Sequence, residues 1–182
     1  KVIERLLDQN MLESSQSPSE EDIERLAVEY ECRVNPTWPM PGVADFLKSL
    51  RDRGLPCGIV SNAQFFTPLL FDAFLDQPIE QLGIDRRLCS WSFQNGCSKP
   101  SSHIFEKSLH NLESLYGISP SNTIYVGNDC LNDVLGARDV GCKTVLFAGD
   151  QRSLRLRRGH PRCRNIQPDI VITELMQLLR EF

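Results

Sequence analysis

Short apolar segments alternate with amphipathic helical patterns through most of this 182-residue chain, and this alternation constrains the fold more than any other feature. Segments typical of buried strands are LPCGIV (Leu55–Val60), TIYV (Thr123–Val126) and KTVLF (Lys143–Phe147). Helical patterns such as Val43–Arg53 and Ser102–Tyr116 separate them. Continuous apolar strands that alternate with helices predict an α/β fold, with a parallel sheet flanked by helices on both faces.

Weaker patterns complete the expected core. We expect further strands at Leu88–Phe93 and Asp169–Ile172, and further helices at Pro68–Phe74, Leu131–Asp139 and Glu174–Arg180. A chain of this length can bury about 70% of its unfolded surface, which is enough for one hydrophobic core. The sequence therefore predicts one α/β domain, with room for a small appendage.

A proline-rich joint, NPTWPMPG, separates this core from the N-terminal part of the chain. Its three prolines hold the backbone extended and stop any helix. Before the joint, the pattern predicts two helices, Val2–Leu12 and Glu20–Cys32, and Ser19 can cap the second. We therefore expect a small helical segment in residues 1–38 and the α/β core in residues 39–182.

The composition excludes several classes of protein. The many Leu, Ile, Val and Phe residues exclude intrinsic disorder, and no apolar run approaches the ~20 residues of a membrane-spanning helix. A net charge of −4 gives no general reason to expect a nucleic-acid partner. Seven cysteines without a C-x-x-C pair argue against a disulfide framework and a zinc ribbon. Because the N-terminal pattern also differs from a signal peptide, we expect reduced thiols in a cytoplasmic protein.

Polar side chains follow the predicted strands, at the edge where parallel sheets bind ligands. Ser61 and Asn62 come directly after one strand, Lys99 follows the next, and Asp129 and Asp133 follow the third. A hydroxyl and backbone N–H groups can donate to anionic oxygens, a lysine can neutralise their charge, and carboxylates can bind Mg²⁺. Each residue alone is more typical of a turn, a helix cap or an exposed surface. The prediction of a phosphoryl and cation site therefore depends on their order and placement.

The order of these motifs resembles the haloacid dehalogenase-like (HAD) hydrolase superfamily. The segment PGVADFLKSLRDRGLPCGIVSN resembles the second motif of that family, with Ser61 as the phosphate-contacting hydroxyl. The segment CSKPSSHIFEKSL resembles the third motif, with Lys99 as its basic residue. The fourth resembles YVGNDCLNDVLGARDVGCKTVLF in its D-x-x-x-D form, with Asp129 and Asp133 as the acids; Asn128 occupies the position directly after the glycine. The terminal strand and helix of the family resemble DIVITELMQLL. The resemblance implies a HAD-like, Rossmann-like core, with the N-terminal helices as a cap.

The chain contains no candidate for the nucleophile that this resemblance implies. The family's first motif is D-x-D at the end of an apolar strand upstream of the cap; its first Asp attacks the substrate and its second is the general acid/base. Asp8 lies in a helical stripe, Asp22 has no apolar strand before it, and Asp52 ends a helix. We therefore expect that an N-terminal segment is absent and that the chain alone does not turn over. Two strands of the sheet would then lack the partner strand between them.

For an intact protein, the resemblance implies hydrolysis of a phosphomonoester through an aspartyl-phosphate. Mg²⁺, held partly by Asp129, would screen the anions as they approach. Ser61 and the backbone N–H near Asn62 would hold the phosphoryl oxygens, and Lys99 would stabilise the charge that develops. Asp133 would support the metal shell or pair with Lys99.

The substrate is expected to be a phosphorylated small molecule, with Gln64 on the substrate side and with no membrane or nucleic-acid partner. Two alternatives stay open: a non-catalytic HAD-fold module that binds a phosphorylated ligand or a protein, and a metal-independent haloacid dehalogenase. The acid pair Asp129 and Asp133 favours the metal-dependent phosphatase. Residues 152–164 hold six arginines, which predict a solvated loop near the active-site edge, an anion or nucleic-acid patch, or a contact with an anionic substrate.

Overall fold

The computed structural model describes residues 19–180 of the chain. The chain divides into two units, Lys1–Pro39 and Met40–Phe182. The helix predicted at Val2–Leu12 lies outside the described residues. None of the helices within the described range combines the length and the apolar character that crossing a bilayer requires.

Helix α2 (Glu20–Val34) forms the described part of the first unit, and it begins where the sequence predicts. The Ser19 hydroxyl accepts the backbone N–H of Asp22 (3.2 Å), and the Asp22 carboxylate accepts the backbone N–H of Ser19 (3.0 Å). This capping box satisfies two N–H groups that otherwise have no partner at a helix start. The predicted helix N-cap at Ser19 is therefore confirmed.

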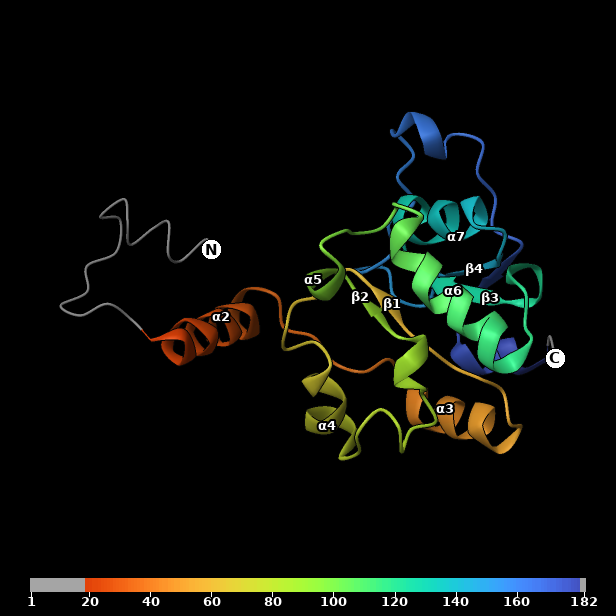
Figure 1. Ribbon diagram of the computed structural model, residues 1–182. Coiled ribbons are helices and arrows are strands. Elements are labelled where there is room, and N and C mark those ends of the chain that lie inside the picture. Colours follow the sequence, from red (N-terminus) through yellow and green to blue (C-terminus); the bar gives the residue numbers. More distant parts are fainter. Residues whose placement is uncertain (1–18, 181–182) are drawn as a thin grey trace. The chain divides into compact units, whose positions relative to one another are not determined.

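The second unit has the predicted α/β fold, with its strands in two parallel sheets (Figure 1). One sheet pairs β1 (Val60–Ser61) with β2 (Ser90–Trp91). The other has the order β3 (Ile124–Gly127), β4 (Lys143–Phe147), β5 (Ile170–Ile172). All strand pairs are parallel, so the strands within each sheet end at a common edge.

Helices cover both faces of the larger sheet. The α-helices of this unit are α3 (Val43–Asp52), α4 (Leu69–Leu75), α5 (Ser92–Asn95), α6 (His103–Tyr116) and α7 (Gly136–Asp139). A π-helix, η3 (Cys130–Leu135), precedes α7, and a 3₁₀-helix, η5 (Leu175–Arg180), lies near the C-terminus. Val145 of β4 packs with Phe46 and Leu50 of α3, whereas its neighbour Leu146 packs with Val134 of η3. Successive strand residues point to opposite faces, so both faces are buried.

Several predicted elements are shorter than expected or of another type. The strand expected at Leu55–Val60 is reduced to Val60–Ser61, with one further bridge at Cys57, because within residues 19–180 it pairs on one side only. The strand expected at Leu88–Phe93 ends at Trp91. There the Asn95 side chain donates to the Ser90 hydroxyl (2.7 Å) and the Trp91 carbonyl (3.0 Å) and closes a helical turn. The helix expected at Leu131–Asp139 is η3 followed by α7, and the helix expected at Glu174–Arg180 is the 3₁₀-helix η5.

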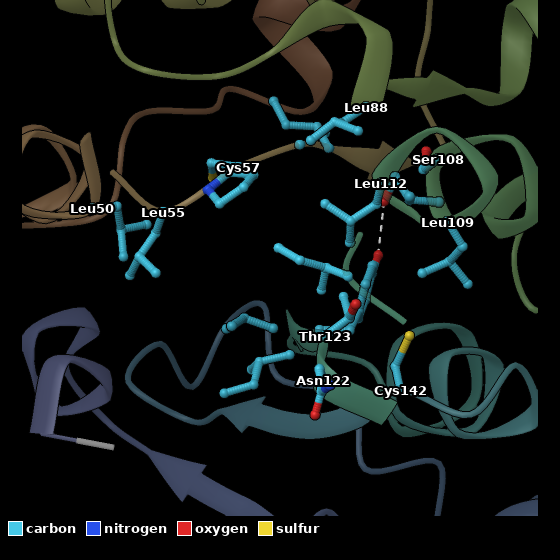
Figure 2. A pocket seen from close by; sticks show the side chains of 18 of the residues that line it. Leu50, Leu55, Cys57, Leu88, Ser108, Leu109, Leu112, Asn122, Thr123 and Cys142 are labelled. Carbon is cyan, nitrogen blue, oxygen red and sulfur yellow. Dashed lines mark hydrogen bonds between the residues drawn. The ribbon is translucent and has the colours of Figure 1, made fainter. Parts of the chain in front are cut away.

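An apolar cavity of about 400 Å³ lies between the two sheets (Figure 2). Residues Cys57–Val60 line it on one side and Thr123–Val126 on the other, with side chains of α3 and α6 around them. In a parallel ladder the N–H and C=O of alternate residues point to opposite neighbours. Ser90 donates to the carbonyl of Ile59, so the backbone of Val60 faces the cavity. Within residues 19–180, each sheet thus has an edge without a strand partner at this cavity.

Asp85 joins the start of the 3₁₀-helix η1 (Arg86–Leu88) to α6, and it supports a prediction on acid stability. The hydrogen bonds from the Arg87 guanidinium (2.7 Å) and the Tyr116 hydroxyl (2.6 Å) lower its pKa, although partial burial opposes this. A carboxylate with a lowered pKa stabilises the fold above its unfolded pKa of about 4, and that contribution disappears as the pH falls. Asp85→Asn should lower the free energy of unfolding by about 1 kcal/mol near pH 7, and urea titrations should show this difference shrinking below pH 4. A difference that stays constant in acid would contradict the assignment.

Candidate active site

An ion pair between Lys99 and Asp133 forms the centre of the candidate site. Lys99 Nζ lies 2.6 Å from Asp133 Oδ1, and the two side chains are only 12% and 6% exposed. Asp133 Oδ2 also accepts the backbone N–H groups of Asn128 (3.0 Å) and Asp129 (2.9 Å). A buried carboxylate is costly without partners, and these three donors, with the longer contact from the Tyr125 hydroxyl to Oδ1 (3.4 Å), compensate for its desolvation. Together they fix the ammonium group of Lys99 beside the carboxyl end of β3.

Tyr125 connects this ion pair to the other sheet. Lys99 Nζ donates to the Tyr125 hydroxyl (3.0 Å), and that hydroxyl donates to the carbonyl of Val60 in β1 (2.7 Å). Burial raises the pKa of Tyr125 well above its ordinary value, and the negative charge of Asp133 adds to the effect. The phenol therefore stays protonated and can keep donating to Val60. Sequence reasoning missed Tyr125, although a polar-tipped aromatic residue inside an apolar strand was a signal that could have identified it.

Asn62 holds the backbone of Lys99 in place. Its side-chain Nδ2 donates to the carbonyl of Lys99 (3.2 Å), and its Oδ1 accepts the backbone N–H of Lys99 (2.7 Å). The loop after β1 is tied down next to it, because the Ser92 hydroxyl accepts from the backbone N–H of Ala63 (2.9 Å) and donates to its carbonyl (3.1 Å). The Asn62 side chain therefore acts on Lys99, a contact that the sequence did not predict.

The two other residues predicted near the phosphoryl group have fewer contacts. Ser61 ends β1, is half-buried and pairs with Trp91. Gln64 is exposed in the next turn, where its backbone N–H donates to the Thr67 hydroxyl (3.1 Å). Within residues 19–180, hydrogen bonds connect Asn62, Lys99 and Asp133, but none connects the side chain of Ser61 or Gln64 to that group.

Asp129, the predicted cation ligand, is buried and paired with Arg157. Its Oδ1 accepts the backbone N–H groups of Leu131 (2.9 Å) and Asn132 (3.2 Å) and so caps η3. Arg157 donates to Asp129 Oδ2 from Nη2 (2.6 Å) and Nε (3.1 Å). Burial would raise the pKa of Asp129, but the Arg157 guanidinium and the two backbone N–H groups outweigh it, and the pKa is lowered. The same contact raises the pKa of Arg157.

Arg157 belongs to the arginine loop, residues 152–164, which runs beside the segment after β3. The backbone of Arg155 donates to the carbonyl of Asn128 (2.8 Å) and accepts the N–H of Cys130 (2.9 Å). The Asn128 side chain donates to the carbonyl of Ser153 (2.8 Å). The loop is therefore anchored at the site edge, and one of its arginines reaches a predicted site residue. Sequence reasoning identified the run of arginines but not which member enters the site.

The oxygen atoms at this edge fit part of a Mg²⁺ site. Within the described residues, no three His, Cys, Asp or Glu side chains converge on one point. However, Mg²⁺ is usually held by one or two carboxylates, and substrate phosphate oxygens and water complete its shell. The Asp129 carboxylate and the Asn128 amide oxygen, on adjacent residues, are donors of the right chemistry for such a partial set.

Comparison with known proteins agrees with this fold. A sequence model described as haloacid dehalogenase-like hydrolase matches residues 2–141. The chain is 32% identical over 145 residues to glyceraldehyde 3-phosphate phosphatase of Pyrococcus furiosus, a match that covers 77% of this chain and 52% of that protein. The chain spans about half the length of the curated relatives that it matches.

Two solved structures show the same fold. A HAD phosphatase from Thermococcus onnurineus superposes with a TM-score of 0.63 at 23% identity, covering 87% of this chain and 63% of that chain. The L-2-haloacid dehalogenase from Xanthobacter autotrophicus gives a TM-score of 0.58 at 22% identity, covering 96% of this chain and 69% of that chain. At these identities the likeness concerns the fold alone.

Proposed function

Because the chain belongs to the haloacid dehalogenase-like hydrolase family, we propose that the intact protein is a Mg²⁺-dependent phosphomonoester phosphatase that acts through an aspartyl-phosphate. The observation that carries the proposal is the buried Lys99–Asp133 pair, braced by Asn62 beside the ends of β1 and β3. A relative in the same family is a glyceraldehyde 3-phosphate phosphatase. The substrate class we propose is therefore a phosphorylated small molecule.

Each residue of the site has a distinct role in this proposal. Lys99 neutralises charge on the phosphoryl oxygens, and its ammonium needs little reorganisation because Asp133 and Tyr125 already hold it. Asn62 is a positioning residue that orients Lys99. Ser61, at the carboxyl end of β1, supplies a hydroxyl to the phosphoryl group. Gln64 lies two residues after Asn62 in the exposed turn and contacts the remainder of the substrate.

Asp129 is the residue we assign to hold Mg²⁺, together with the amide oxygen of Asn128. A bound Mg²⁺ would screen the negative charges of the carboxylate and the phosphoryl group from each other. Mg²⁺ takes hard oxygen donors, and it keeps positions for substrate oxygens and water. The near-complete burial of Asp129 supports the assignment, because a buried carboxylate keeps a fixed direction.

The nucleophile, in this proposal, is an aspartate on an apolar strand that enters the cavity between the two sheets. The cavity lies between the edges of β1 and β3 that have no strand partner in the described part of the chain, and its lining is mostly apolar. In the described part of the chain, the buried hydroxyl of Ser108 in its wall has no hydrogen-bond partner. A strand inserted there would pair with backbone groups on both sides and end beside Lys99. The described chain without that strand is then inactive.

Two further features belong to the same proposal. Residues 1–38 are proposed to be the cap segment of the family, and the protein is proposed to work in the cytoplasm. The odd number of cysteines without a C-x-x-C pair supports a reducing compartment. A second candidate is a non-catalytic module that binds a phosphorylated ligand. The coding sequence upstream of Lys1 distinguishes the two: an apolar strand that ends in D-x-D favours the enzyme, and a stop codon favours the module.

The test uses the protein together with its upstream coding residues. It should hydrolyse p-nitrophenyl phosphate in the presence of Mg²⁺, and chelation by EDTA should abolish turnover. Asp129→Asn should lower kcat by about a hundredfold, because the variant loses a charged ligand of the cation. Asp52→Asn is the matched control, since Asp52 is exposed and pairs with Lys48 on the surface of α3. Mg²⁺-dependent turnover that survives Asp129→Asn would remove the assignment of Asp129, and halide release without metal would favour a dehalogenase.

A further inference from the structure

Arg157 is hydrogen-bonded to Asp129, the carboxylate that we propose as the ligand of the cation. Its guanidinium donates to both oxygens of Asp129, with Nε 3.2 Å from Oδ1 and 3.1 Å from Oδ2, and with Nη2 2.6 Å from Oδ2. The backbone N–H groups of Leu131 and Asn132 take further positions on Oδ1, and Asn132 Nδ2 donates to Oδ2 (3.2 Å). A carboxylate offers about four lone-pair sites, so these contacts saturate it. A cation and the guanidinium therefore cannot hold Asp129 at the same time.

The partners of Asp129 differ in how easily they can leave. The N–H groups of Leu131 and Asn132 belong to the first turn of η3, and releasing them would unwind the helix start. Arg157 contacts Asp129 through the end of a long side chain that is still 42% exposed. Its guanidinium can rotate into water while the backbone stays in place. Arg157 is thus the partner that a cation would displace.

The backbone of the arginine loop aims this side chain at the site. Two hydrogen bonds hold Arg155 against Asn128 and Cys130, two residues before Arg157. Arg157 itself has a φ of +52°, a left-handed conformation that is uncommon for a residue other than glycine. The two hydrogen bonds of Arg155 hold the backbone of the arginine loop beside the residues that flank Asp129, so the backbone of Arg157 stays near the site when its side chain is released.

We propose that Arg157 is a built-in competitor of the divalent cation: its guanidinium and the cation bind Asp129 alternately. The inference rests on the proposed cation site and adds a control over its occupancy. Two ligands that exclude each other weaken each other's binding by the same factor. A cation that binds Asp129 therefore releases the guanidinium of Arg157, and the guanidinium weakens the binding of the cation. Removing the guanidinium should therefore tighten cation binding.

The experiment titrates the 182-residue chain and its variants with Mn²⁺, as a substitute for Mg²⁺, and follows the electron paramagnetic resonance signal of the free ion. Arg157→Gln should raise the Mn²⁺ affinity about tenfold, in line with the loss of a bidentate charged contact. Arg157→Lys should lie between this variant and the wild type, because lysine keeps the charge without the bidentate geometry. Arg158→Gln is the matched control. It removes the same charge from the next exposed residue, which forms no ion pair within residues 19–180, and should change the affinity less than twofold.

Asp129→Asn separates the two levels of the proposal. If this variant loses Mn²⁺ binding while Arg157→Gln and Arg158→Gln have the same Mn²⁺ affinity, the proposal that Arg157 competes with the cation is wrong, and the assignment of Asp129 as its ligand is kept. If Asp129→Asn binds Mn²⁺ as the wild type does, the cation assignment itself is wrong, and the competition falls with it. Circular dichroism of each variant checks the fold. Should Arg157→Gln be unfolded, the Nε–H resonance of Arg157 in the wild-type chain decides, because Mg²⁺ should shift it and an unchanged resonance overturns the inference.

Discussion

Replacing Lys99 by methionine is expected to lower the free energy of unfolding by about 3 kcal/mol, because the substitution leaves Asp133 charged and buried without its cation. The backbone N–H groups of Asn128 and Asp129, with the longer contact from the Tyr125 hydroxyl (3.4 Å), would then have to compensate for the desolvation of this carboxylate. Methionine keeps the length of the lysine chain, so the loss reports on charge rather than on packing. Urea unfolding of the 182-residue chain measures the effect.

Lys48→Met is the control for this substitution. Lys48 pairs with Asp52 on the surface of α3, where the two side chains are 64% and 53% exposed. Exposed ion pairs contribute little, so this variant should stay within about 0.5 kcal/mol of the wild type. The double variant Lys99→Met/Asp133→Asn should recover part of the stability, because it leaves neither charge alone. A loss below about 1 kcal/mol for Lys99→Met would contradict the buried ion pair.

The same substitution should also remove catalysis from the protein with its upstream residues. We expect kcat to fall about a thousandfold, the upper range for loss of one donor that stabilises charge in a transition state. Temperature must be kept well below the unfolding midpoint, so that lost activity does not report lost fold. If the Lys99→Met variant is folded and still turns over at the wild-type rate, the charge-stabilising role of Lys99 is wrong.

Replacing Gly127 by alanine is expected to cost about 3 kcal/mol as well, for a steric reason. A Cβ at Gly127 would overlap with Cγ and Oδ2 of the Asp133 side chain. Asp133 cannot move aside without breaking its contacts with Lys99 and with two backbone N–H groups. The glycine at the end of β3 is therefore needed for this close approach.

Gly159→Ala is the control for the steric argument. Apart from Gly159 itself and its two chain neighbours, no heavy atom of the described residues lies within 4 Å of a Cβ built at Gly159, and the residue is in the arginine loop, outside the strands. Its unfolding midpoint should match the wild type. Thermal unfolding followed by circular dichroism compares the two variants. Equal midpoints for Gly127→Ala and Gly159→Ala would show that the Asp133 side chain can move aside without loss of stability.

The local patterns of the sequence predicted much of the secondary structure. The strand Lys143–Phe147 has its predicted bounds, α2 begins at Glu20 after its Ser19 cap, and α6 ends at Tyr116 before Gly117. These features depend on residues only a few positions apart: the period of the apolar residues, a capping side chain, or a glycine that adopts a left-handed C-cap. The predicted α/β fold is confirmed for the same reason, because alternating strands and helices allow few other arrangements.

Predictions that required knowledge of the neighbours were less accurate. The strand around Val60 is short because it pairs on one side only in the part of the chain that the structure describes, and the segment after Asp129 begins as a π-helix rather than an α-helix. The order of polar residues after the strands directed attention to Lys99 and Asp133. It did not reveal that Asn62 braces Lys99 or that Tyr125 joins the two sheets.

The sequence by itself determined the types of the main elements and the family, because both are encoded in patterns along the chain. Only the tertiary structure decided which charges meet. Asp129 and Arg157 are 28 positions apart, and their contact depends on the path of the arginine loop beside β3. The cavity between β1 and β3 is likewise formed by segments distant in sequence. Pairings of this kind arise from how the chain folds back on itself, and the energy of each depends on burial that no local pattern specifies.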